Sequence, residues 1–136
     1  MIGIVLVSHG DLGRELLNAA ELICGQHDQV AVLGLQAGDA IDALPDRIRE
    51  AIDGLGSVDG VLVLVDLFGG SPANATLRVL AEANIECVSG VNLPMLLEVL
   101  MMREGLDAGE LAVLALQAGQ QGMQNLGQRL RDQMNA

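Results

Sequence analysis

The feature that most constrains the fold is a regular alternation of short apolar runs with longer segments in which apolar residues recur at helical spacing. The runs predict strands over residues 2–7, 29–35, 60–65, 86–91 and 111–116. The longer segments predict helices over about 12–24, 39–55, 71–83, 94–102 and 120–133. Apolar runs without polar alternation are typical of parallel strands buried on both faces. The order therefore predicts a three-layer α/β sandwich with a mostly parallel sheet.

Several helix boundaries carry recognisable residues. Gly25 is a C-cap candidate for the first helix, Asp39 an N-cap candidate for the second, and Ser71-Pro72 an N-cap and first-turn proline for the third. The inner faces of these three helices are predicted to comprise Leu16, Ala19, Ala20 and Ile23; Ile41, Leu44, Ile48, Ala51, Ile52 and Leu55; and Ala73, Leu77, Leu80 and Ala81.

One domain covering residues 1–136 is expected, because this length is enough for an independent core and no repeat or linker interrupts it. The segment 94–102 is apolar nearly all round, broken only by Glu98. That is more apolar surface than a small monomer normally exposes. The sequence therefore predicts a homo-oligomer, most simply a homodimer.

The charge balance argues against several classes of partner. All seven basic residues are Arg, and 18 acids give a net charge of −11, so neither nucleic acid nor an anionic membrane surface is an expected partner. No apolar run reaches the roughly 18 residues of a membrane span, and no signal peptide is evident, which favours a cytoplasmic protein. Cys24 and Cys87 are expected to be reduced, buried thiols. Cys24 and His27 have a metal-like spacing, but two ligands do not make a site, so no metal is predicted and His27 is assigned to the surface.

Polar residues end the first and third predicted strands. Ser8 and His9 follow the first apolar run, and Asp66 follows the third. In doubly wound sheets, ligands bind beyond the carboxyl ends of the strands, where the strand order reverses. With the common order 2-1-3-4, His9 and Asp66 would lie side by side, and the carboxylate would hold one imidazole nitrogen as N–H, leaving the other free as a nucleophile.

The segment after Asp66 adds an anion site. Gly69 and Gly70 lead through Ser71 into a helix N-terminus, where unpaired N–H groups attract anions. Together these features predict a phosphoryl group carried on His9, with Gly10 allowing close approach to that group. Taken singly, each has an ordinary interpretation: a loop histidine, a capping aspartate and a turn into a helix.

Other nucleotide or catalytic sites lack their essential residues. A P-loop and a response-regulator receiver both require lysine, which is absent. Phe68 is the only aromatic residue available to stack on a flavin, and Ser71 lies in G-G-S-P rather than in the nucleophile elbow of a serine hydrolase. No cofactor is predicted.

Three segments carry a family resemblance over essentially the whole chain. These are IVLVSHG at 4–10, LVDLFGGSPANA at 64–75 and GVNLPMLLE at 90–98. In this order and spacing they resemble the IIA component of the mannose-type (mannose/fructose/sorbose) sugar phosphotransferase system of bacteria.

The resemblance implies a phosphotransferase component that accepts a phosphoryl group from phospho-HPr and passes it to a IIB component. By motif, His9 is phosphorylated at Nε2, Asp66 orients its ring and Ser71 contacts the phosphoryl group. The family fold has a parallel sheet of order 2-1-3-4 with an added antiparallel strand exchanged across a dimer, here assigned to Leu111–Leu116. Because the chain ends at Ala136, its IIB partner is expected to be a separate protein.

Two functional alternatives stay open: a sensor of phosphorylation state without sugar transport, and the phosphotransfer subunit of a dihydroxyacetone kinase system. Leu67 and Phe68 are candidates for partner docking, with burial under the following helix as the alternative. Asn74 and Asn92 lie near the predicted site, where capping is favoured over phosphate contact.

Overall fold

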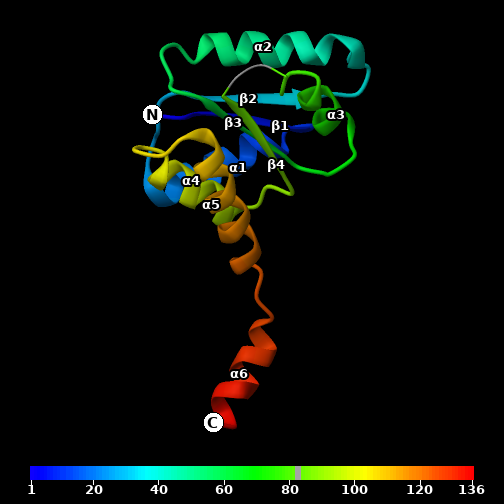
Figure 1. The fold of residues 1–136 in the computed structure, drawn as a ribbon. Helices are drawn as coiled ribbons and strands as arrows, with labels where there is room; N and C mark the ends of the chain where they lie inside the picture. The colour runs from blue at the N-terminus through cyan, green and yellow to red at the C-terminus, as the bar shows by residue number, and fades with distance from the viewer. Residues whose placement is uncertain (82–83) are drawn as a thin grey trace.

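A parallel sheet forms the centre of the molecule. The computed structural model describes residues 1–81 and 84–136. Its strands are β1 (Gly3–His9), β2 (Val30–Leu35), β3 (Val61–Val65) and β4 (Ile85–Ser89). They pair in parallel in the order β2-β1-β3-β4, which confirms the expected 2-1-3-4 order and places β1 and β3 side by side (Figure 1).

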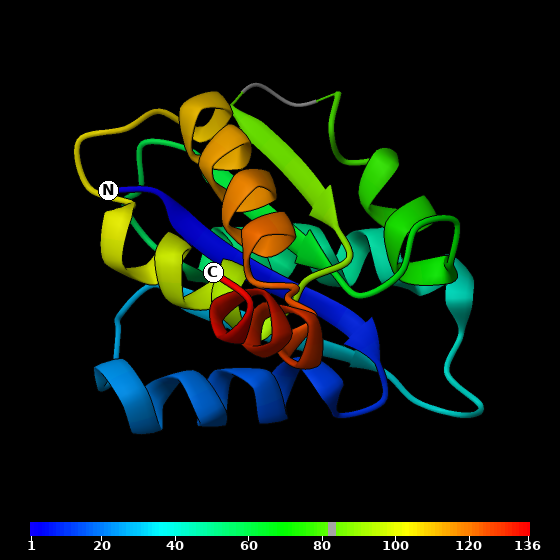
Figure 2. The ribbon, with the colours of Figure 1, turned by 90° about the horizontal axis from the view of Figure 1, so that it is seen from below.

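Helices cover both faces of this sheet. They are α1 (Leu12–Cys24), the 3₁₀ turn η1 (Ile41–Ala43), α2 (Leu44–Gly54), α3 (Ser71–Leu77), α4 (Leu93–Met102), α5 (Ala108–Gln121) and α6 (Leu126–Met134). Figure 1 shows α2 and α3 on one face and α1, α4 and α5 on the other. Figure 2 looks onto the second face, where these helices lie across the strands. The predicted three-layer arrangement is confirmed.

The two faces of β1 determine where its last side chains point. Ile4 and Leu6 pack in the cluster under α1, α4 and α5, whereas Val5 and Val7 pack in the cluster under α2 and α3. Successive strand side chains point to opposite faces. His9, two residues after Val7, therefore points toward the α2/α3 side.

The predicted fifth strand is wrong, because Leu111–Leu116 lies inside α5. A capping box starts this helix: the Asp107 carboxylate accepts from the Glu110 N–H at 2.7 Å, and the Asp107 N–H donates to Glu110 Oε1 at 3.1 Å. Leu111 and Ala115, four residues apart, are fully buried, as helical periodicity requires. The described part of the sheet thus has four strands and no added antiparallel strand.

The start of the second helix also differs from its prediction. Asp39 does not cap a helix; its carboxylate accepts from the backbone N–H of Gln36 at 2.8 Å and contacts Arg47 at 3.4 Å. The chain instead forms η1, and α2 begins at Leu44, with a proline in its first turn. A carboxylate that bonds to the preceding loop is not free to cap the following helix.

The third helix is shorter than predicted. Gly70, not Ser71, is its N-cap residue. It ends at Leu77, where the Val79 N–H bonds to the Thr76 carbonyl at 2.8 Å and tightens the last turn. The predicted end near residue 83 lies outside the described residues. Four side chains assigned to inner faces are exposed instead: Ile23, Ile41, Leu77 and Ala81.

The apolar helix α4 is covered in part by its own chain. It packs between α1 and α5, where Met95, Leu96, Val99 and Leu100 are buried, whereas Met101 and Met102 at its end are exposed. Further exposed apolar side chains lie on α6, which stands away from the layers beyond the end of α5 (Figure 1). Gly122 to Asn125 separate α5 from α6, so the predicted helix over 120–133 is two helices. None of the helices that the structure describes is long and apolar enough to cross a membrane.

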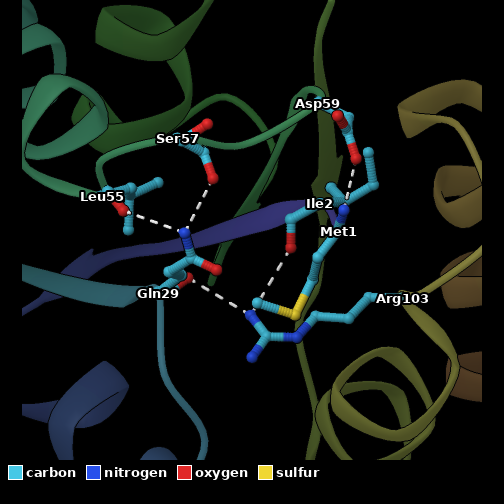
Figure 3. Close-up of polar contacts among 7 residues, drawn as sticks. All are labelled: Met1, Ile2, Gln29, Leu55, Ser57, Asp59 and Arg103. Atoms are coloured by element: carbon cyan, nitrogen blue, oxygen red, sulfur yellow. Dashed lines mark hydrogen bonds and ion pairs between the residues drawn. The ribbon is translucent and has the colours of Figure 1, made fainter.

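A buried arginine holds the amino ends of the strands (Figure 3). Arg103 is 3% exposed, and its guanidinium donates to the carbonyls of Ile2 at 3.4 Å, Gln29 at 3.3 Å and Asp28. Burial lowers the pKa of this guanidinium from its ordinary value, while the charges of Glu104 and Asp28 oppose that shift. This edge is opposite the one where β1 and β3 end.

Candidate functional site

The end of β1 brings a histidine against a buried carboxylate from the end of β3. His9 Nδ1 lies 2.9 Å from Asp66 Oδ2, and the same oxygen accepts the backbone N–H of His9 at 2.9 Å. The Asp66 side chain is 8% exposed and that of His9 49% exposed. The adjacency predicted from the topology is confirmed.

This contact assigns the state of the imidazole ring. A carboxylate oxygen accepts hydrogen bonds, so the contact assigns a proton to Nδ1, and in the neutral ring Nε2 then keeps its lone pair. The half-exposed ring leaves Nε2 open to an incoming group. Asp66 Oδ1 is buried without a hydrogen-bond partner among the described residues. The carboxylate thus makes both of its bonds to His9 through a single oxygen.

Gly70 forms the surface beside Nε2. A Cβ added there would lie 3.0 Å from His9 Cε1 and 3.5 Å from Nε2. Any side chain at position 70 would therefore crowd the reactive edge of the ring. Gly69, just before it, has a φ of +81°, the left-handed conformation that favours glycine. Ser71 follows as the first residue of α3 and is partly exposed.

The glycine after the histidine has a conformational role. Gly10 has a φ of +55°, and a Cβ added there would meet no atom within 4 Å. The left-handed backbone at this position is a second reason for a glycine, in addition to the predicted close approach of a bound group. The turn it makes carries the chain from β1 toward α1.

Comparison with known proteins gives this geometry a context. The family described as "PTS system fructose IIA component" matches residues 3–115. The chain belongs to this phosphotransferase-system IIA family. It is 35% identical over 127 residues to the mannose-specific EIIAB component of Escherichia coli K12, an alignment covering 92% of this chain and 39% of that relative. The chain thus spans well under half the length of that relative.

Other IIA proteins match over more of their own length. The fructose-specific EIIA component of Bacillus subtilis is 35% identical over 112 residues, 82% of this chain and 77% of that protein. The crystal structure of an EIIA component from Streptococcus agalactiae superposes with a TM-score of 0.86 at 26% identity, covering 94% of this chain and 99% of that one. The resemblance identified from the three motifs is confirmed at the level of the family.

Two apolar residues stand at the rim of the site. Leu67 is 58% exposed and Phe68 86% exposed. Burial under α3, the alternative interpretation, is therefore wrong.

The two asparagines predicted to act as helix caps differ. Asn92 caps α4 by accepting from the Met95 N–H at 3.0 Å, whereas Asn74 lies exposed within α3 and is not its N-cap.

His27 lies away from the site, in the turn between α1 and β2. Its Nδ1 is 3.9 Å from Cys24 Sγ and 3.1 Å from the Gly25 carbonyl oxygen. Across residues 1–81 and 84–136, no group of three or more His, Cys, Asp or Glu side chains could hold a metal ion.

Sequence reasoning missed the polar contacts that hold the loop after His9. The hydroxyl of Ser8 is buried and accepts the Gly13 N–H at 2.9 Å, and Gln36 Nε2 donates to Asp11 Oδ1 at 3.0 Å. The available signal was a serine in the last positions of an otherwise apolar, fully buried strand. Such a hydroxyl needs a partner, and the following helix start supplies one.

Proposed function

We propose that this protein is a phosphocarrier of the sugar phosphotransferase system, which accepts a phosphoryl group on His9 Nε2 from an HPr-type donor and passes it to a IIB component. The observation that carries the proposal is the single-oxygen contact of Asp66 with His9 Nδ1 at 2.9 Å, which leaves a half-exposed Nε2 beside Gly70. Membership of the IIA family supports it.

The transfer is a displacement at phosphorus between two imidazoles. The lone pair of His9 Nε2 forms a bond to phosphorus while the bond from phosphorus to the donor's ring nitrogen breaks, and its electron pair returns to the donor ring. Positive charge develops on the His9 ring, and the Asp66 carboxylate stabilises that charge through Nδ1–H. The second transfer repeats these steps with His9 as the leaving group.

Gly10, Gly69, Gly70 and Ser71 are proposed to receive the phosphoryl oxygens. The absence of a side chain at Gly70 leaves room next to Nε2, and α3 begins at the next residue, where the Ser71 N–H has no partner within the helix. The Ser71 hydroxyl can donate a further hydrogen bond. Leu67 and Phe68 are proposed to contact the partner proteins, since exposed apolar residues at a site rim suit a transient interface.

The working form is proposed to be a homodimer in the cytoplasm, where its proposed partners act. Met123, Leu126, Leu130 and Met134 expose apolar side chains on and just before α6. A helix with such a stripe normally buries it against another element. A second copy of the chain would supply that element.

The phosphocarrier role is tested by incubating the purified chain with phosphoenolpyruvate, enzyme I and HPr. Intact mass is then measured at alkaline pH, where phosphohistidine survives. We expect the mass of one phosphoryl group on the wild type and on His27→Ala, and none on His9→Ala. Adding a IIB component should remove the phosphoryl group from the wild type. A wild type that stays unmodified would exclude the proposal.

A further inference from the structure

The side chain before the nucleophile is a buried hydroxyl on the opposite face of β1. Ser8 is 1% exposed, and its Oγ accepts the Gly13 N–H at 2.9 Å. The same hydroxyl is directed at the Gly10 carbonyl oxygen, 3.5 Å away. Because strand side chains alternate, Ser8 points under α1 while His9 points toward α3. Ser8 therefore contacts the loop after His9 without approaching the reacting atoms.

The contact with Gly13 replaces an ordinary helix cap. Asp11 is the N-cap residue of α1, but its side chain makes no capping hydrogen bond and accepts from Gln36 instead. Gly13 is the second residue of α1, whose first N–H groups have no partner within the helix. The Ser8 hydroxyl satisfies one of them. The start of α1 is thereby tied to the end of β1.

The neighbouring strand β2 holds the same loop from its other side. The Gly10 N–H donates to the Leu35 carbonyl at 2.8 Å, and a Cβ added at Gly34 would lie 2.2 Å from the Gly10 carbonyl oxygen. Gly10 thus has no room to move toward β2. Together with the bond from the His9 N–H to Asp66, these contacts hold the backbone on both sides of the nucleophile.

We propose that Ser8 is a positioning residue for phosphoryl transfer, one that fixes the direction of His9 Nε2 by holding Gly10 and Gly13 in place. The inference rests on the proposed function of His9. An in-line displacement needs the attacking nitrogen in one position, and a displacement of about 1 Å costs about a hundredfold in rate. Without the hydroxyl, the loop loses its link to the start of α1, while the bonds from the His9 N–H to Asp66 and from the Gly10 N–H to Leu35 remain.

The kinetic test compares Ser8→Ala, Ser8→Thr and Val99→Ala, using phospho-HPr as the donor. Val99 is buried in α4, so its truncation is a control for lost stability. We expect Ser8→Ala to lower the transfer rate at saturating donor by roughly tenfold to a hundredfold, with the half-saturating donor concentration changed less than about twofold. Ser8→Thr keeps a hydroxyl and should restore most of the rate. Equal losses in Ser8→Ala and Val99→Ala would overturn the proposal, as would a wild-type rate in Ser8→Ala.

A second measurement needs no partner protein and so separates this inference from the proposed function. In wild-type protein, NMR should detect close contact between the His9 Cε1 proton and the Gly70 α-protons, and a ring with its proton on Nδ1. Ser8→Ala should weaken that contact and mix the two tautomers. If Ser8→Ala does not fold, Ser8→Cys keeps the side-chain shape with a poor acceptor and should give the same change. An unchanged His9–Gly70 contact in the folded variant would overturn positioning, whether or not the wild type accepts a phosphoryl group.

Discussion

At the scale of single residues, Asp66 determines which nitrogen of His9 is available. Its Oδ2 accepts both the ring Nδ1–H and the backbone N–H of the same residue, so ring and backbone are aligned by one atom. The hydrogen bond also stabilises the ring when it becomes positively charged. The proposed reactivity of His9 therefore depends on the pair.

Replacing Asp66 with Asn is expected to slow phosphorylation of His9 by at least about tenfold, because an amide neither fixes the tautomer nor stabilises a charged ring. The rate is measured by intact mass after rapid mixing with phospho-HPr. Asp53→Asn, on α2, is the matched control and should react like the wild type. An Asp66→Asn variant that transfers at the wild-type rate would remove the orienting role.

Gly70→Ala is expected to reduce phosphorylation strongly while leaving the fold intact. The added methyl group would stand 3.0 Å from His9 Cε1, at the edge where the phosphoryl group is proposed to arrive. Gly54→Ala on α2 meets no atom within 4 Å and serves as the control. That variant should gain roughly 0.4–1 kcal/mol of stability at unchanged activity, because alanine restricts the unfolded chain. Thermal unfolding and the mass assay are measured together, and equal activity of the two variants would argue against crowding.

Cys87 gives a prediction for alkaline pH. Burial raises the pKa of its thiol from the ordinary 9.0 to about 11. At pH 8 the thiolate fraction is then about a hundredfold lower than for an ordinary thiol, so alkylation in a Cys24→Ser background should be slow until the chain is unfolded. Because the folded-state pKa is the higher one, stability present below pH 9 is lost as pH rises toward 11. Fast alkylation of the folded protein at pH 8 would contradict the assigned burial effect.

At the scale of elements, local hydrogen bonds decided where helices begin. The apolar run 111–116 suits a strand or a helix by length, and the capping box of Asp107 and Glu110 favours the helix. The third helix, α3, starts one residue earlier than Ser71-Pro72 predicted, with Gly70 as N-cap. A short apolar run fits a strand or a helix equally well unless the capping residues that flank it are also considered.

Removing the Asp107 cap is expected to destabilise α5 by about 1 kcal/mol in Asp107→Ala, measured by urea unfolding. Asp132→Ala, on α6, removes a carboxylate that accepts from Gln128 on an exposed face, and it should cost much less stability. Equal losses of unfolding free energy in the two variants would mean that the capping box does not stabilise the helix in the folded protein.

At the scale of the whole molecule, the C-terminal helix α6 carries several of the exposed apolar side chains. Leu126, Leu130 and Met134 follow one another at intervals of four residues, so they form one stripe along α6. In α4, Met95, Leu96, Val99 and Leu100 are buried, whereas Met101 and Met102 at its end are exposed. The stripe on α6 is the surface proposed to contact a second copy.

Leu130→Gln is expected to weaken self-association, measured by sedimentation equilibrium, with little change in the unfolding of the sandwich, because α6 stands apart from it. Arg129→Gln, a substitution on an exposed polar side chain of the same helix, is the control and should leave the association unchanged. A wild type that is monomeric at high concentration would contradict the proposed dimer.

Much of this protein was predictable because its information is local. Four of the five predicted strands follow from apolar runs, and, given the common strand order 2-1-3-4, the adjacency of His9 and Asp66 follows from the rule that ligands lie at the carboxyl ends of parallel strands. Composition and the absence of lysine removed competing phosphate sites.

The tertiary structure decided what depends on contacts between distant segments. Ser8 and Gly34 make their contacts where the loop after β1 packs against α1 and β2. The spacing of residues in the sequence does not predict that packing. The same holds for α4, whose apolar faces are covered by α1 and α5, and for Leu67 and Phe68, left exposed at the rim. Periodicity indicates which side chains need burial, but only packing determines which surface buries them.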